Sequence, residues 1–217
     1  MSAAKAVGPL LVAALVSQCT PPLARAVTPP PVDERWLPTA ASPAPAQHTE
    51  QRETCAVATA ASDISGAPAQ LAGIDLPQLW QFTRGAGQRV VVIDTGVHAH
   101  SRLKHLTAGG DYVTRGDGTL DCDAHGTLVA GIIAATTGPD FTGIAPDVAL
   151  ISIRQSSSKF GPAGDRSGSG AGDVATLAKA VRTAADLGAT IINISTFACA
   201  PAAKPPDDRA LGAALSY

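Results

Sequence analysis

Two side chains with complementary acid–base chemistry follow one another along the chain. Asp94 ends an apolar run in the segment VVVIDTGV (residues 90–97), and His125 opens the segment HGTLVAG (residues 125–131). A buried carboxylate that accepts the Nδ1 proton of an imidazole sets its tautomer and stabilises its protonated form. The imidazole can then remove a proton from a hydroxyl nucleophile and later return it to a leaving amine. The pair predicts hydrolysis by aspartate, histidine and serine, in that chain order.

No serine in the sequence stands where such a nucleophile is expected. Ser167 and Ser169 lie in a glycine-rich loop, and Ser195 follows a predicted strand, so we interpret them as substrate-loop or structural residues. The nucleophile and an oxyanion donor are therefore expected outside this chain. Loss of one oxyanion donor lowers the rate by roughly 10²- to 10³-fold, and loss of the nucleophile lowers it further. A catalytically inactive protein that acts by binding stays open as the alternative.

An alternating α/β pattern predicts the elements that hold this pair. Three apolar, β-branched runs are typical of strands buried on both faces, and helical patterns separate them. We expect strands at residues 89–93, 148–153 and 190–194, and helices at residues 76–82, 126–135, 172–187 and 207–216. Strands separated by helices favour right-handed crossovers, so the predicted fold class is α/β, a three-layer, doubly wound and mainly parallel sheet. Asp94 would lie at the carboxyl edge of this sheet, where such folds place their sites.

The residues after His125 favour its approach to Asp94. Gly126, Ala130 and Gly131 have little or no side chain, so the helix that follows His125 can lie close to the sheet. The tripeptide Asp-Thr-Gly at residues 94–96 also occurs in aspartic proteases, where the aspartate is half of a dyad. That interpretation needs a second copy or a symmetric dimer in a β-rich fold, and the helical patterns argue against it.

Three segments of different character divide the chain. Residues 1–26 have a basic start, a short apolar run and the cleavage-site pattern Ala24-Arg25-Ala26, which together predict a signal peptide. Residues 27–70 form a proline-rich N-terminal extension, which is expected to be irregular because proline fixes φ and removes a backbone donor. Residues 71–217 carry the predicted α/β domain. We therefore expect an exported protein, and no transmembrane segment is predicted after the signal peptide.

Charge and composition argue against several classes of function. The net charge of −2 and the lack of a basic run give no reason to expect nucleic acid as a partner. His98, His100 and His105 fit no structural zinc spacing, so we predict no metal site. The glycine-rich run at residues 168–172 resembles a dinucleotide-binding loop only loosely. We expect no cofactor.

The two motifs resemble those of the subtilisin-like serine proteases, the subtilases. Further segments that resemble the family in the same order are GIAP (143–146), ALISIR (149–154), GSG (168–170) and IINIS (191–195). The resemblance implies a subtilisin-like fold and a secreted serine endopeptidase that acts on a protein or peptide, with Asp94 and His125 as triad members. It also implies that Ser195, Thr196 and Phe197 form the substrate-binding strand and the edge of the S1 pocket. The family's oxyanion asparagine and its G-T-S-x-A-x-P segment have no counterpart, so the resemblance covers the N-terminal half only.

Several details resemble one branch of the subtilases, the mycosins associated with type VII secretion. Leu128 stands where most subtilases have a second histidine, and the segment Asp121-Cys122-Asp123 before His125 is similar to that branch. The resemblance implies an extension that wraps the body, a disulfide between Cys55 and Cys122, and a type VII secretion membrane complex as a partner. The membrane anchor expected in the full-length family is absent here, and a partner for Cys199 is expected beyond Tyr217.

Overall fold

A computed structural model describes residues 32–57, 71, 73–138, 141–165, 170–196, 203 and 205–217. The chain divides into two units, Met1–Pro31 and Val32–Tyr217, and every described residue belongs to the second. The predicted signal peptide therefore lies outside the described residues, and the predicted extension is described only in part. Its boundaries stay predictions.

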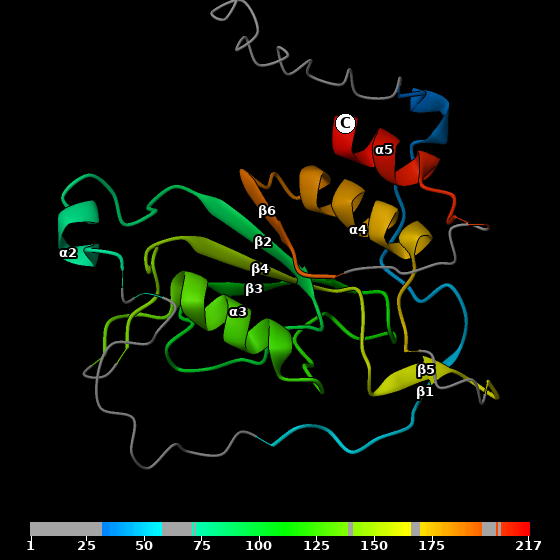
Figure 1. Ribbon diagram of the computed structural model, residues 1–217, viewed down its shortest axis with the longest axis horizontal. Coiled ribbons are helices and arrows are strands. Elements are labelled where there is room, and N and C mark those ends of the chain that lie inside the picture. The colour runs from blue at the N-terminus through cyan, green and yellow to red at the C-terminus, as the bar shows by residue number, and fades with distance from the viewer. Residues whose placement is uncertain are drawn as a thin grey trace, which may run out of the picture. The chain divides into compact units, whose positions relative to one another are not determined.

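Four of the described strands are parallel and form the central sheet, in the order β3-β4-β2-β6. These strands are β2 (Arg89–Asp94), β3 (Leu106–Asp111), β4 (Ala149–Arg154) and β6 (Ile191–Ile194). Figure 1 shows α4 (Val174–Asp186) and α5 (Arg209–Ser216) over one face of the sheet and α3 (His125–Ala134) on the other. This arrangement confirms the predicted three-layer α/β class, in which helices connect parallel strands.

Both faces of β2 are buried, as its unbroken apolar run predicts. Val91 belongs to the same core cluster as Val181 of α4, whereas Val92 belongs to a second cluster with Ala130 of α3. Successive side chains of a strand point to opposite faces, so β2 is anchored to both helical layers. Burial of one such aliphatic side chain contributes roughly 1.5–3 kcal/mol. The core therefore holds the end of β2, and Asp94 with it, firmly in place.

Most predicted elements are present with small shifts at their ends. The predicted strands correspond to β2, β4 and β6, and the three longer predicted helices to α3, α4 and α5. The remaining helix, α2 (Leu76–Leu79), is shorter than the predicted range 76–82, and a turn follows it. Asp75 caps α2, but none of its residues is buried, so no packing extends it beyond one turn. No helix among the described residues is long and apolar enough to cross a membrane.

The edge strand β3 was not predicted. Its sequence, LTAGGD, contains no apolar run, and its register against β4 shifts between Ala108 and Gly110. At Gly109, a Cβ atom would stand 2.6 Å from Cγ2 of Ile151, so β3 lies too close to β4 for a side chain there. A strand that packs through glycine and pairs on one side only leaves little signal in the sequence.

The described part of the N-terminal extension is attached to the body at several points. Its strand β1 (Thr49–Gln51) pairs antiparallel with β5 (Phe160–Pro162), and Glu34–Trp36 form a short 3₁₀ helix, η1. A disulfide joins Cys55 to Cys122, as predicted. The sequence analysis did not predict β1 and β5, because each is short and their pairing joins segments far apart in the chain.

Candidate active site

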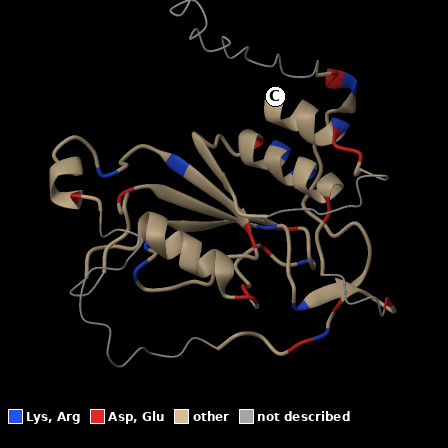
Figure 2. Cartoon of the chain, viewed as in Figure 1, with Lys and Arg blue, Asp and Glu red and all other residues tan. Residues whose placement is uncertain are grey.

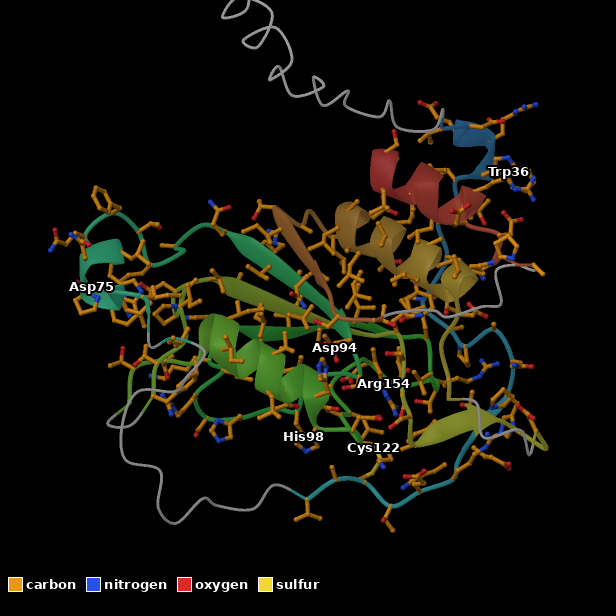
Figure 3. The ribbon with its side chains drawn as sticks, in the orientation of Figure 1. Trp36, Asp75, Asp94, His98, Cys122 and Arg154 are labelled. Carbon is orange, nitrogen blue, oxygen red and sulfur yellow. A yellow bond between two sulfur atoms is a disulfide. The ribbon has the colours of Figure 1, made fainter. Side chains whose placement is uncertain are left out.

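Asp94 lies at the carboxyl end of β2, at the edge of the sheet where a site was predicted (Figure 3). Its side chain is only 1% exposed. The Oδ1 atom accepts a hydrogen bond from the backbone N–H of Thr95 (2.6 Å) and lies 2.7 Å from Nδ1 of His125. This geometry suits a carboxylate that accepts the Nδ1 proton of the imidazole and orients the ring.

His125 is the first residue of α3, and its side chain is 55% exposed. The contact with Asp94 is made through Nδ1, which leaves Nε2 free of hydrogen bonds within the described part of the chain. An imidazole held in this way can use Nε2 as a general base or acid toward a group in the adjacent cleft. The structure thus brings together the two residues that the sequence analysis paired.

Two glycines allow this approach. At Gly126, a Cβ atom would lie 3.1 Å from both Cβ and Oδ1 of Asp94, so a side chain there would press on the carboxylate. Gly96 adopts φ 103°, a conformation that side-chain-bearing residues rarely adopt, and the chain turns there directly after Asp94 and Thr95. Gly126 and the buried Ala130 therefore serve the predicted close contact between α3 and the sheet. The prediction was wrong for Gly131, because no atom lies within 4 Å of its would-be Cβ.

The two aspartates just before His125 make more hydrogen bonds than the sequence indicated. Asp121 accepts hydrogen bonds from the side chain of Thr95 and from Thr127. Asp123 accepts from the hydroxyl of Ser157 and from both the backbone N–H and the hydroxyl of Ser158. In the sequence these aspartates served only as marks of resemblance, although two acids just before a helix are a general sign of capping.

A buried arginine lies beside Asp94 at the same edge. Arg154 ends β4 and is paired in register with Asp94, and both are labelled in Figure 3. Its side chain is fully buried, lies 4.5 Å above the ring of Phe160, and places Nη1 3.5 Å from Oδ2 of Asp111. In the sequence, Arg154 stood out only as the last residue of a segment that resembles the family.

An open cleft of about 1070 Å³ runs past the exposed side of His125. Ser195 and Thr196, which follow β6, line this cleft, as do Thr95 and Asp123. The structure therefore places these two predicted substrate-binding residues and His125 along one cavity, whereas Phe197 lies outside the described residues. Sites for small molecules usually measure about 300–1,000 Å³, so the volume of this cleft is sufficient for a short segment of peptide.

None of the described serines that line the cleft is hydrogen-bonded to the imidazole of His125. The Ser157 and Ser158 hydroxyls donate to Asp123, and the Ser195 hydroxyl accepts from the side-chain amide of Asn193. Ser167 and Ser169 lie outside the described residues. Among the described residues, no hydroxyl is hydrogen-bonded to Nε2 of His125.

Metal-ligating side chains do not gather in the described ranges. Within residues 32–57, 73–138, 141–165 and 170–196 and the described C-terminal residues, no three His, Cys, Asp or Glu side chains could together hold a metal ion.

Comparisons with known proteins place these residues in a family context. The family model described as Subtilase family matches residues 85–208. Mycosin-4 of Mycobacterium tuberculosis (strain ATCC 25618 / H37Rv) is 65% identical over 201 residues, which are 90% of this chain and 44% of that protein. Mycosin-3 of the same strain is 48% identical over 205 residues, 91% of this chain and 44% of that protein. The chain thus spans about half the length of the relatives it matches.

Solved structures of related proteins have the same fold. The crystal structure of MycP1 from Mycobacterium smegmatis matches with a TM-score of 0.78 and 38% identity, over 88% of this chain and 52% of that one. A chain in the periplasmic assembly from the ESX-5 inner membrane complex matches with a TM-score of 0.79 and 41% identity, over 88% of this chain and 53% of that one.

Proposed function

The chain belongs to the subtilase family, and from that membership we propose that it supplies the acid and base of a secreted serine endopeptidase of the mycosin type. The observation that carries the proposal is the 2.7 Å contact between Oδ1 of Asp94 and Nδ1 of His125. It joins a buried carboxylate to a half-exposed imidazole that lines an open cleft of about 1070 Å³. Both residues stand in the segments that match the family model.

In the proposed reaction, Asp94 keeps the proton of His125 on Nδ1, so that Nε2 has a lone pair to receive a proton. Nε2 removes the hydroxyl proton of a serine as its oxygen attacks the peptide carbonyl, and later gives that proton to the leaving amine. The resulting acyl-enzyme is then hydrolysed by water with the same proton movements in reverse order.

The proposal assigns the substrate to the cleft that His125 shares with Ser195 and Thr196. These residues follow β6, and the family resemblance extends this role to Phe197. An extended peptide along that edge would bring its carbonyl carbon next to the imidazole. The cleft is open and measures about 1070 Å³, which suits a segment of a protein chain more than a small molecule.

The nucleophile must come within hydrogen-bonding distance of Nε2. No described serine does so, and the mycosin relatives are long enough to carry one outside the region that aligns with this chain, which covers 44% of Mycosin-4. We therefore propose, as the resemblance to the family implies, that the nucleophile is a serine that is not among the described residues.

The cellular setting follows from the relatives and the predicted signal peptide. One matching chain is part of a periplasmic assembly of the ESX-5 inner membrane complex. We propose that this protein is exported and works in the cell envelope, in association with a type VII secretion complex.

A fluorophosphonate serine probe tests the enzymatic proposal. The protein is produced from its own gene in its native host, labelled, and identified by mass spectrometry of the labelled species. Labelling that depends on both Asp94 and His125, shown by Asp94→Asn and His125→Ala, supports the proposal. Absence of labelling in folded protein would instead favour a catalytically inactive protein that binds in the secretion machinery, the alternative left open because no described serine contacts Nε2 of His125.

A further inference from the structure

The helix that carries His125 begins without a cap of its own. Ala124, the residue before α3, adopts a left-handed conformation (φ 65°) and has no side chain that could accept a hydrogen bond. The first N–H groups of a helix have no partner within the helix and need one from elsewhere. In this protein, the N–H of Gly126 donates to the hydroxyl of Thr95 (3.0 Å), and the N–H of Thr127 donates to Oδ2 of Asp121 (2.8 Å).

Asp121 ties these partners into one network. Its Oδ1 accepts from the hydroxyl of Thr95 (2.8 Å), and its Oδ2 accepts a second bond from the hydroxyl of Thr127 (2.6 Å). The side chain of Asp121 is buried, and its charge lies at the positive end of a helix that has no charged residue along its length (Figure 2). Hydrogen bonds to a charged group that is shielded from water are among the stronger ones in proteins.

The network links the two backbone segments of the candidate site. Thr95 follows Asp94 directly and donates its N–H to Oδ1 of that carboxylate, while its hydroxyl contacts both Asp121 and the first turn of α3. Asp121 therefore connects the turn after β2 to the start of α3. These are the two backbone segments on which Asp94 and His125 stand.

The position of His125 depends on this backbone more than on its own contacts. Its side chain is half exposed, and among the described residues its ring makes one hydrogen bond, to Asp94. A small displacement of the first turn of α3 would break that bond. We propose that Asp121 is a positioning residue, which holds the first turn of α3 against the Asp94 turn and so keeps the imidazole on the carboxylate.

Asp123 offers a matched comparison. It lies two residues away in the same segment and accepts three hydrogen bonds, but they come from Ser157 and Ser158 in the loop after β4. Loss of Asp123 would loosen the wall of the cleft without freeing the N–H groups of α3. The two aspartates thus have the same chemistry, but only the loss of Asp121 is expected to displace His125.

The test is the proton NMR signal of the His125 Nδ1–H group, recorded on the whole chain as wild type, Asp121→Ala, Asp121→Asn and Asp123→Ala. We expect the wild-type signal far downfield, as for an imidazole proton bonded to a carboxylate. In Asp121→Ala, exchange of this proton with water should be faster by at least about tenfold. Asp121→Asn, which keeps one carbonyl acceptor, should lie between, and Asp123→Ala should match wild type.

Contrary outcomes are equally clear. A wild-type chain without the signal, Asp121 variants with wild-type exchange, or an equal effect of Asp123→Ala would overturn the inference. If Asp121→Ala does not fold, Asp121→Asn has nearly the native size and decides the comparison alone. The inference rests on the proposed function for the use of His125, but the signal needs no nucleophile. A chain that fails to label with the serine probe can therefore still confirm or refute the role of Asp121.

Discussion

Gly126 of α3 lies so close to Gly96 that a Cβ atom at residue 126 would stand 2.1 Å from the Gly96 carbonyl oxygen. Both partners in this contact are glycine backbone, so no side chain could rotate to make room for the extra atom. The distance between α3 and the turn after β2, and with it the contact between Asp94 and His125, therefore depends on the absence of one methyl group.

Gly126→Ala is accordingly expected to destabilise the fold by about 1–3 kcal/mol, the usual cost of forcing an extra methyl group into a packed contact. Gly131 lies on the same helix and has no atom within 4 Å of its would-be Cβ, so Gly131→Ala should be neutral or stabilising by up to about 1 kcal/mol. Chemical denaturation of both variants measures the difference. Equal stabilities of the two variants would contradict the close approach.

The disulfide between Cys55 and Cys122 joins residues 67 positions apart. Such a cross-link restricts the unfolded chain, and its removal typically costs about 2–5 kcal/mol. We expect the melting temperature to fall in the double variant Cys55→Ser/Cys122→Ser. A reductant should lower the wild-type melting temperature to a similar value and leave the double variant unchanged. A wild-type protein that melts at the same temperature with and without reductant would show that this bond does not stabilise the fold.

Asp94→Asn tests the proposed orientation of the imidazole in protein that labels with the serine probe. An amide in place of the carboxylate favours the wrong tautomer of His125, so kcat is expected to fall by about 10⁴-fold with little change in KM. Asp147→Asn is the control, because Asp147 pairs with Arg84 at 2.8 Å outside the residues that line the cleft. A loss confined to KM would mean that Asp94 acts on substrate binding instead.

Burial raises the pKa of the Tyr112 hydroxyl above its usual value of 10, although a hydrogen bond with Thr183 acts in the opposite direction. In the unfolded chain this hydroxyl ionises at a lower pH than in the folded protein. Its contribution to stability is therefore complete below pH 10 and is lost as the pH rises through the folded pKa.

The chain contains two tyrosines, so Tyr217→Phe leaves Tyr112 as the only phenol. We expect the ultraviolet absorbance of tyrosinate in this variant to appear with a midpoint above pH 10. Unfolding by urea should show stability that declines across the same range, and Tyr112→Phe should remove that decline. A midpoint at or below 10 would contradict the burial of this hydroxyl.

The central strands and their layers were predictable from the sequence because their signal is local. The run Val90–Ile93 is apolar on both faces, and such a run is typical of a strand that helices cover on both sides. The edge strand β3 and the pair β1–β5 were not predictable in the same way. Their residues are not distinctive, and they become strands only because a partner lies beside them.

The residues of the candidate site also differ in how far the sequence could predict them. Asp94 and His125 were identified from their segments, since the aspartate ends a buried strand and the histidine precedes a helix of small residues. The hydrogen-bond partners of Asp121 were not predicted, because an acid before a helix indicates a cap in general but not which groups it binds. Asp121 gains its place from Thr95 and Thr127, which reach it from two different segments.

The sequence by itself determined the α/β class, the pairing of an acid with a base and the resemblance to the subtilases, because periodicity and short motifs are properties of consecutive residues. The tertiary structure decided which oxygen of Asp94 meets which nitrogen of His125, which aspartate caps α3, and which edge accepts β3. These depend on distances between segments remote in the chain. A hydrogen bond requires its two atoms to lie about 3 Å apart, and the packing of the folded chain decides which atoms come that close.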